Sequence, residues 1–440
     1  MASGDSEGSK LAHPTRQQVS VALAAAVTAP GVVLRITDAH LADPLAAVLF
    51  GLSIVGAAFM LSWAAEAAQL DISAGLAIAV LALIAVLPEY AVDLVFAIKG
   101  GDSFQQFGRA CPPLGTGDES PCALALANMT GANRLLIGIG WSMVVFVAWI
   151  QWRKRGDREQ ARQVTLDRSR SVELSYLAVA TMYSLTLPLK RSITLVDAAI
   201  LVSIFVAYTV RISRAPAEEP HLIGPAAWIG EFPKNRRRTS VIALFVVAAA
   251  VILLTAEHFA DALVGTGKEL GIREFLLIQW LAPLASEAPE LLVAGLYAAR
   301  LNTNAGLGTL VSSKVNQWTL LVGTLPIAFA IASRSVHGLP IVAEQRGEVF
   351  LTAAQSVFAV AILITLSMTM VEATVLFALF SVQFVAGALG PSAIHDEVRI
   401  LTSVAYLVLA VGILLRERRS VPSLFRDGFR VKYAELTDSR

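Results

Sequence analysis

Residues 63–90 read WAAEAAQLDISAGLAIAVLALIAVLPEY, and residues 255–291 read TAEHFADALVGTGKELGIREFLLIQWLAPLASEAPEL. Both stretches hold an acidic, alanine-rich segment, a short turn, a run of small residues and then Pro-Glu deep in an apolar run. Glu89 and Glu290 occupy the same place in the two stretches. An apolar segment with a polar middle follows each one, LANMTGAN (126–133) and GTLVSSKVN (308–316). The chain therefore repeats itself internally.

The composition indicates a membrane protein. Of 440 residues, 55% are hydrophobic and only 16% are charged, whereas soluble domains carry about 25% charged residues. The apolar residues fall in blocks of roughly 17–25, the length needed to cross a bilayer. This pattern excludes a soluble enzyme, a disordered protein and a disulfide scaffold. The net charge of +1 gives no reason to expect a nucleic-acid partner.

Twelve membrane spans are predicted, at roughly 19–36, 44–69, 74–98, 122–151, 172–189, 193–210, 240–263, 274–299, 304–332, 349–367, 371–389 and 399–415. With the N-terminus inside, 23 of the 35 Lys and Arg residues lie in inside segments and ten in outside loops, Arg399 among the ten. Cytoplasmic loops carry the excess of positive charge. We therefore expect an integral plasma (inner) membrane protein with both termini in the cytoplasm.

The repeat divides the chain into two halves of five spans each. An odd number of spans places the halves in opposite orientations, which is the inverted repeat of secondary transporters, with the site at the midplane. The expected fold is an all-α polytopic membrane protein with an extra helix at each end. The predicted segments are a tail and extra helix (1–43), the first half (44–211), a cytoplasmic linker (212–239), the second half (240–389), and an extra helix with a basic tail (390–440).

The two Pro-Glu pairs predict a cation site. Charge at membrane depth is costly, so ionisable residues within spans are functional candidates. Pro88 and Pro289 each free the carbonyl four residues back, that of Ile84 and that of Ala285. A free carbonyl beside Glu89 or Glu290 offers the hard oxygens that Na⁺ and Ca²⁺ prefer. A single pair can mark a helix end at an interface, but two pairs at matching repeat positions favour a site.

Helical spacing adds further groups to this site. Glu287 lies three residues before Glu290, and Asp93 lies one turn beyond Glu89. Neutral oxygens are expected from the neighbouring spans, from Asn128, Thr309, Ser312 and Ser313. Glu66 and Glu257 are placed near the ends of their spans, where structural pairing is the expected role.

Taken together, these residues resemble the sodium/calcium exchanger superfamily of cation antiporters. That family carries a small-residue–Thr–Ser–x–Pro–Glu segment and a Gly-Asn-x-x-Gly-Ser-Asn segment in each repeat. Residues 87–89 (LPE) and 286–290 (SEAPE) match the first element, residues 128–133 (NMTGAN) match the second, and residues 309–314 (TLVSSK) occupy its place in the other half. The resemblance implies five-plus-five spans, Glu89 and Glu290 as central cation ligands, Asn128 as a further ligand, and Thr309 as its equivalent.

The sequence departs from that pattern at charged positions. Lys314 replaces the asparagine that matches Asn133, and Arg134 lies nearby in the first half. An ammonium among carboxylates can take a cation's place and, on losing its proton, admit a metal ion, which favours coupling of protons to Na⁺ over Ca²⁺ transport. A fixed Lys314–Glu287 ion pair that only holds spans together is the alternative. Ala85 and Val86 stand where the family has hydroxyl groups.

Cys111 and Cys122 flank the proline- and glycine-rich outside loop before the fourth span. A disulfide in an oxidising compartment and two free thiols both fit these positions.

The function predicted from these features is secondary antiport of Na⁺ or Ca²⁺ against H⁺ or Na⁺, with alternating access to a midplane carboxylate site. The alternatives are a transport-inactive homologue, with the site neutralised by Lys314 and Arg134, and a cation channel. No HExxH, GxSxG or histidine cluster suggests an enzyme. The expected partners are small inorganic cations and membrane lipid, with no cofactor. Monomer and homodimer both remain open.

Overall fold

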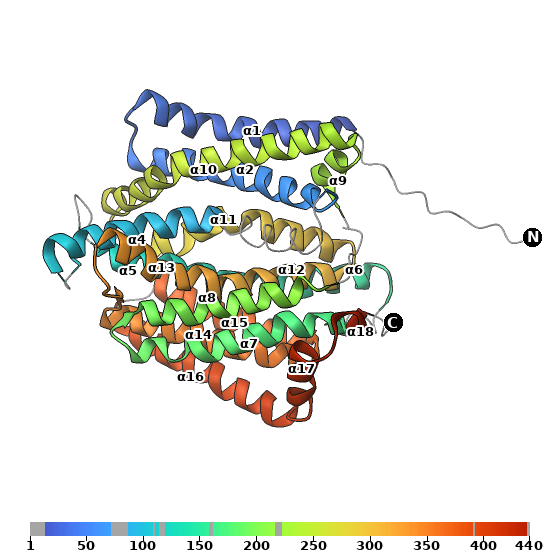
Figure 1. Ribbon diagram of the computed structural model, residues 1–440. Helices are drawn as coiled ribbons and strands as arrows, with labels where there is room; N and C mark the ends of the chain where they lie inside the picture. Colours follow the sequence, from blue (N-terminus) through green and yellow to red (C-terminus); the bar gives the residue numbers. More distant parts are fainter. Residues whose placement is uncertain are drawn as a thin grey trace, which may run out of the picture.

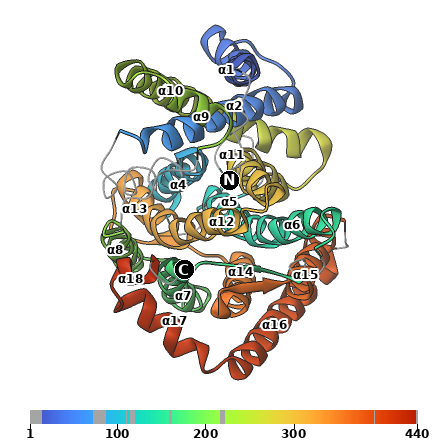
Figure 2. The same cartoon turned by 90° about the vertical axis from the view of Figure 1, so that its right-hand side faces the viewer.

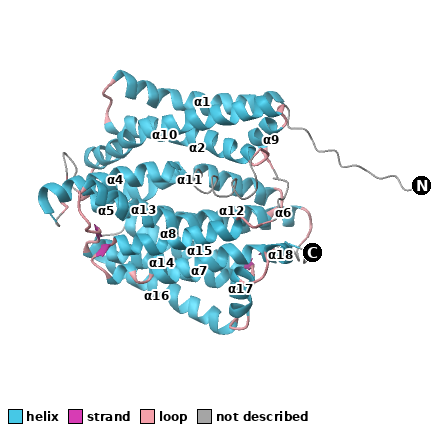
Figure 3. Ribbon diagram, viewed as in Figure 1, coloured by secondary structure: helices cyan, strands magenta, loops and turns pink. Residues whose placement is uncertain are grey.

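A computed structural model gives the architecture, and it describes residues 14–71, 87–108, 111–113, 119–157, 162–215, 222–389 and 392–437. Almost all of these residues are helical (Figure 3). The predicted all-α polytopic fold is confirmed. The first part of the third predicted span, 74–86, lies outside the described residues. This range includes Ile84, Ala85 and Val86.

The helices of the first part of the chain are α1 (Pro14–Thr37), α2 (Asp43–Ala68), α4 (Leu87–Phe107), α5 (Pro121–Leu135), α6 (Ser142–Lys154), α7 (Ser171–Ser184) and α8 (Leu195–Ile212). A π-helical turn, η2 (Leu136–Trp141), joins α5 to α6 without a break. Short 3-10 turns, η4 (Arg168–Arg170) and η5 (Leu187–Leu189), flank α7.

The second part of the chain has the same order of elements. After the short α9 (Gly224–Gly230) come α10 (Lys234–Leu270), α11 (Glu274–Ala299), α12 (Thr303–Asn316), the π-helical turn η6 (Gln317–Leu321), α13 (Val322–Ala332), α14 (Ala343–Ile362), the 3-10 turn η7 (Leu363–Thr365) and α15 (Met370–Leu389). The chain ends with α16 (Ser392–Arg416), α17 (Ser420–Phe429) and α18 (Tyr433–Thr437). Each π-helical turn thus follows the helix that carries a polar repeat motif.

Two small antiparallel sheets join the two parts of the chain. β1 (Gln163–Thr165) pairs with β4 (Ser367–Thr369), and β2 (Ser192–Ile193) pairs with β3 (Leu339–Pro340). The two strand pairs lie at opposite ends of the helix bundle (Figure 3). The connections before and after α7 are therefore each fixed to a connection of the second part.

Ten helical segments within the described residues are long and apolar enough to cross a membrane. The helices that carry the Pro-Glu pairs, α4 and α11, are not among these ten. The chain is an integral membrane protein. The count of twelve spans, the inverted repeat and the segment boundaries stay predictions.

The helices lie side by side along one common direction (Figure 1). Seen along that direction, α1, α2 and α10 lie on one side, α7, α14, α16 and α17 on the other, and α4, α5, α11 and α12 between them (Figure 2). Apolar side chains of α1, α8, α10 and α16 are exposed, as expected for helices that face lipid. The central helices are therefore the ones that can hold buried polar groups.

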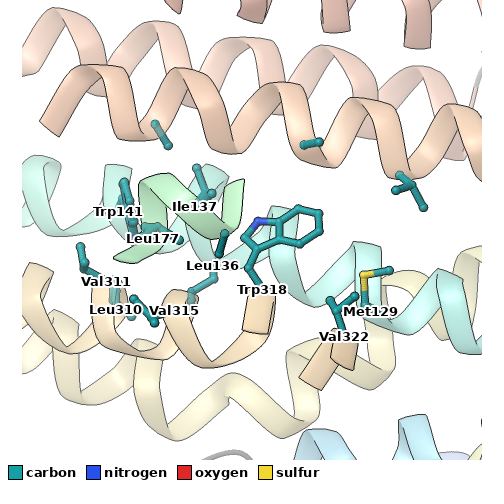
Figure 4. Packing of buried hydrophobic residues seen from close by; sticks show 14 of the residues in the cluster. Met129, Leu136, Ile137, Trp141, Leu177, Leu310, Val311, Val315, Trp318 and Val322 are labelled. Atoms are coloured by element: carbon teal, nitrogen blue, oxygen red, sulfur yellow. The ribbon is translucent and has the colours of Figure 1, made fainter. Parts of the chain in front are cut away.

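The interior is closely packed around two tryptophans. Trp141 and Trp318 are fully buried, and Trp318 packs among Leu136, Met129 and Val322 (Figure 4). Its indole N–H donates to the Ser356 hydroxyl at 2.8 Å, which satisfies the polar end of the ring. The π-helical turns thus lie within the apolar core.

A glycine sets the distance between α5 and α11. A Cβ atom on Gly131 would lie only 1.7 Å from the carbonyl oxygen of Gln279. Only glycine permits this approach of two backbones. The contact packs α5, which carries Asn128, directly against α11, which carries the second Pro-Glu pair.

The structure also settles two expectations about loops. Cys111 and Cys122 form a disulfide. Arg399 was assigned to an outside loop, and this was wrong. It lies seven residues into α16 and is buried. Its guanidinium forms ion pairs with Glu348 and Asp396.

The C-terminal helix α17 is fixed to the first part of the chain. Arg168 donates to both carboxylate oxygens of Asp427, at 2.6 and 3.0 Å. Arg211 donates to the carbonyl of Gly428 at 3.0 Å, and the Ser175 hydroxyl donates to that of Leu424 at 3.1 Å. The hydrogen bond from Arg168 holds the pKa of the Asp427 carboxyl below its usual range.

This lowered pKa predicts acid-sensitive docking of α17. Because the pKa is depressed in the folded state, the stabilisation is fully present above about pH 4, the ordinary aspartate value, and is lost as the pH falls below it. Asp427→Asn should remove a charge-assisted pair of about 1.5–3 kcal/mol at pH 7. We expect amide exchange in residues 420–429 to rise at least about tenfold in the variant at pH 7, whereas the wild type needs acid. Equal exchange in both proteins at pH 7 would contradict this role.

Candidate cation site

Two helices position the carboxyl groups predicted from the Pro-Glu pairs. Within the described residues, α4 carries Pro88 and Glu89. α11 runs unbroken through Pro283 and Pro289 and presents Glu287 and Glu290 one turn apart. Glu89 and Glu287 are buried, whereas Glu290 is half-buried. Pro88 thus directly precedes Glu89 on α4, and Pro289 directly precedes Glu290 on α11.

The structure brings the three glutamates together. The carboxyl groups of Glu89 and Glu287 lie within hydrogen-bonding reach of each other, and the charge of Glu290 acts on both. Because ionised carboxylates only accept hydrogen bonds, two such groups meet favourably when a proton or a cation lies between them. Among the described residues, the Oε2 atoms of Glu89, Glu287 and Glu290 are buried without a hydrogen-bond partner. The geometry therefore corresponds to a carboxyl cluster that can take up positive charge, as protons or as a cation.

Gln317 is a further member of this cluster that the sequence did not reveal. It lies in the π-helical turn η6, and its amide donates to Glu287 Oε1 and also contacts Glu89. Gln317 lies three residues after Lys314, so helical spacing places both side chains on the same face. This spacing could have indicated Gln317 from the sequence.

Asp93 and Asn128 form a neighbouring polar pair. Asn128 Nδ2 donates to Asp93 Oδ1 at 2.7 Å, and both residues are buried. Within the described part of the chain, Asp93 Oδ2 and Asn128 Oδ1 have no partner. Since Asp93 also acts on Glu89 through its charge, the pair extends the acidic cluster by one turn of α4.

The hydroxyl groups predicted from α12 are not joined to the carboxyls. Thr309 is half-buried and donates to the carbonyl of Ala305 in its own helix at 2.9 Å. Ser312 contacts the hydroxyl of Tyr208 on α8. Ser313 is buried, and no hydrogen bond links it to the glutamates among the described residues. These side chains must rotate to contribute to a cation site.

Lys314 does not form the ion pair with Glu287 that one interpretation of the sequence required. Its Nζ donates to the carbonyl of Asn133 at 2.8 Å and also to the Asn133 side chain, and it lies 5.3 Å from the ring centre of Trp318. No carboxylate among the described residues forms an ion pair with it. Asn133 is the counterpart of Lys314 in the other polar motif. This contact therefore joins the two motifs directly.

Arg134, the other residue expected to compensate the site charge, lies in an ion pair of its own. Its guanidinium forms an ion pair with Glu348 at 2.7 Å, and Arg399 pairs with the same carboxylate at 3.1 Å. Gln279 also donates to Glu348 at 3.1 Å, and Gln383 accepts from Arg134 at 3.0 Å. The charge of Arg134 is therefore matched within a separate buried network on α5, α14 and α16.

The described residues contain no group of three His, Cys, Asp or Glu side chains gathered closely enough to hold a metal ion.

Comparison with known proteins gives the family. The family model described as sodium/calcium exchanger protein matches residues 44–213 and 240–389. The chain belongs to the sodium/calcium exchanger family. This exchanger is 39% identical to a protein whose crystal structure is described as the H⁺/Ca²⁺ exchanger CAX. The match covers 97% of this chain and 100% of that chain, with a TM-score of 0.84.

A more distant structure shares the fold. The native YfkE structure matches 89% of this exchanger and 100% of its own chain at 14% identity and a TM-score of 0.58. No curated protein matched the sequence. The family moves cations in exchange for one another, so cation and calcium antiport is the general activity of this exchanger.

Proposed function

We propose that this exchanger moves Ca²⁺ across the membrane against H⁺, with Glu89, Glu287 and Glu290 binding the two ions in turn. The observation that carries the proposal is the meeting of the buried Glu89 and Glu287 carboxyl groups beside Glu290, because such a cluster is favourable when it holds protons or a cation. The similarity to a protein described as an H⁺/Ca²⁺ exchanger supports the choice of ions. Ca²⁺ prefers carboxylate and carbonyl oxygens, which this cluster offers once it is deprotonated.

Competition for the same oxygens couples the two fluxes. Empty carboxylates at membrane depth are costly, so a state with neither Ca²⁺ nor protons reorients slowly. Either ion neutralises the cluster and permits the change of access. Asp93 and Asn128 would supply further oxygen ligands beside Glu89, since each has an oxygen without a partner among the described residues. Pro289 would contribute by freeing the carbonyl of Ala285.

Two alternatives are compared with this proposal. Coupling of Na⁺ to H⁺ rested on Lys314 as an ammonium among carboxylates; Lys314 bonds to Asn133, and its charge also acts on Glu287 and Glu89. A transport-inactive homologue rested on neutralisation by Lys314 and Arg134, and the charge of Arg134 is matched by Glu348. The distribution of Lys and Arg supports the further proposal that both termini face the cytoplasm.

The test uses purified exchanger in liposomes that contain a pH indicator. With an acidic interior and Ca²⁺ outside, we expect Ca²⁺ uptake together with loss of internal protons. A protonophore should abolish the pH-driven part of the uptake. An outward Na⁺ gradient at constant pH should drive none. Uptake driven by Na⁺ alone, or no Ca²⁺ flux under either gradient, would overturn the proposal.

A further inference from the structure

A small cavity lies where α11, α14 and α16 begin and α15 ends, apart from the carboxyl cluster. Its volume is about 40 Å³, roughly three times the space that one water molecule needs. Polar side chains from five helices line it, namely Arg134, Arg273, Gln279, Glu344, Glu348, Gln383, His395 and Arg399. The cavity therefore has room for a small ion or one polar group, but not for a whole organic molecule.

The buried part of this lining carries an excess of positive charge. The side chains of Arg134 and Arg399 are only 3% and 10% exposed, and both pair with the same carboxylate, that of Glu348. The other acidic groups at this place, Glu344 and Asp396, have mostly exposed side chains, so water screens their charge. Two buried guanidinium groups thus share one buried carboxylate. A further negative charge placed here would lower the cost of burying the second cation.

Gln383 on α15 offers a donor that nothing else in the described structure uses. Its side chain lines the cavity, and the residue is only 7% exposed. Because its Oε1 accepts from Arg134 at 3.0 Å, its Nε2 is the end that donates. Among the described residues, this Nε2 is buried without a hydrogen-bond partner. A buried donor without an acceptor is costly, so the cavity lacks an acceptor at this position.

Arg273 supplies a third guanidinium at the mouth of the cavity. It directly precedes α11, and its side chain is 40% exposed. It donates to the carbonyl of Gly387 at 3.0 Å and lies 3.3 Å from His395 Nδ1. A guanidinium has five N–H groups, so Arg273 can bind an anion as well as this carbonyl. The starts of α11, α14 and α16 add partial positive charge at the same end.

We propose that this cavity binds a phosphate group. Guanidinium groups match the geometry of phosphate oxygens, and Gln383 Nε2 would donate to one of them. The negative charge of the phosphate would balance the excess of buried positive charge on Arg134 and Arg399. Inorganic phosphate and the headgroup of an anionic phospholipid both carry such a group. Exposed apolar residues beside the lining, Val385 on α15 and Ile394 on α16, would let the chains of a lipid lie along these helices.

The test measures binding to the purified full-length exchanger in detergent. Radiolabelled inorganic phosphate and labelled short-chain phosphatidylglycerol are titrated separately, at an ionic strength held constant with sodium gluconate. We expect saturable binding of about one molecule per chain for at least one probe, together with a rise in the midpoint of thermal unfolding. Binding of inorganic phosphate alone assigns a site for the free ion, and binding of phosphatidylglycerol alone assigns a headgroup site. Absence of saturable binding for both probes would overturn the proposal.

Variants show whether the bound group lies in this cavity. Arg273→Gln and Gln383→Leu each remove a donor to the phosphate, so the Kd should rise at least about tenfold in each. Arg273 is partly exposed, so Arg273→Gln carries the test if Gln383→Leu does not fold. Arg334→Gln is the matched control, because Arg334 is an exposed cation in the connection before α14 and does not line the cavity. Its affinity for the probe should equal that of the wild type.

Two results with the variants would contradict this site. Unchanged affinity in Arg273→Gln and Gln383→Leu would place the bound group elsewhere, and an equal loss in Arg334→Gln would indicate general attraction to surface charge. Binding is measured without a Ca²⁺ or proton gradient. Its outcome is therefore independent of which ions the exchanger moves.

Discussion

Replacing Glu290 with glutamine should reduce Ca²⁺/H⁺ exchange at least about 100-fold, and Glu89→Gln should do the same, since each change removes both a Ca²⁺ ligand charge and a proton acceptor. Glutamine keeps the size and most of the polarity of glutamate, so packing around α4 and α11 should change little. The measurement is Ca²⁺ uptake by liposomes with an acidic interior, at matched protein content.

Comparing exchange of Ca²⁺ for H⁺ with exchange of Ca²⁺ for isotopically labelled Ca²⁺ makes this prediction more specific. Both Ca²⁺/H⁺ and Ca²⁺/Ca²⁺ exchange should be lost in Glu290→Gln and Glu89→Gln, because the same oxygens bind both ions. Glu257→Gln is the matched control, since Glu257 also lies in a long helix but is mostly exposed and paired with Lys99. It should keep near-normal flux. Flux above about one-tenth of the wild-type rate in either cluster variant would mean that its carboxyl is not an essential ligand.

The carboxyl cluster was accessible from the sequence because its signal is local and duplicated. A proline directly before a glutamate, deep in an apolar run and at two matching positions, left few other interpretations. Helical spacing then correctly placed Glu287 beside Glu290 and Asp93 near Glu89. The membrane class followed from composition, since the length and hydropathy of apolar runs depend on the bilayer and not on tertiary contacts.

The contacts of Lys314 and Arg134 could not be predicted in the same way. Lys314 bonds to Asn133, and Arg134 to Glu348, across roughly 200 residues of sequence. Which buried charges meet depends on the rotation of each helix about its axis and on the close approach at Gly131, and neither follows from local periodicity. The two strand pairs and the π-helical turns escaped the sequence for the same reason, because they arise where separate connections and helices meet.

Replacing Glu348 with glutamine should destabilise the exchanger more than any other single change in its charged network. Glu348 is the common partner of Arg134 and Arg399, and its side chain is only 10% exposed. Its loss leaves the buried Arg134 guanidinium without a counter-charge and leaves Arg399 with only the exposed Asp396, which costs about 3–5 kcal/mol. The midpoint of thermal unfolding in detergent should fall sharply, as followed by tryptophan fluorescence.

Two further variants test the physical reason for that loss. Glu344→Gln, four residues earlier on α14, removes a carboxylate whose side chain is 54% exposed and that lies 4.0 Å from Arg273, so the expected cost is at most about 1 kcal/mol. Adding Arg399→Gln to Glu348→Gln removes one of the unpaired charges and should recover part of the lost stability, which a double-mutant cycle measures directly. If the double variant were less stable than Glu348→Gln by the full cost of Arg399→Gln alone, the two residues would be independent. The network would then hold α14 to α16 through packing and not through its charges.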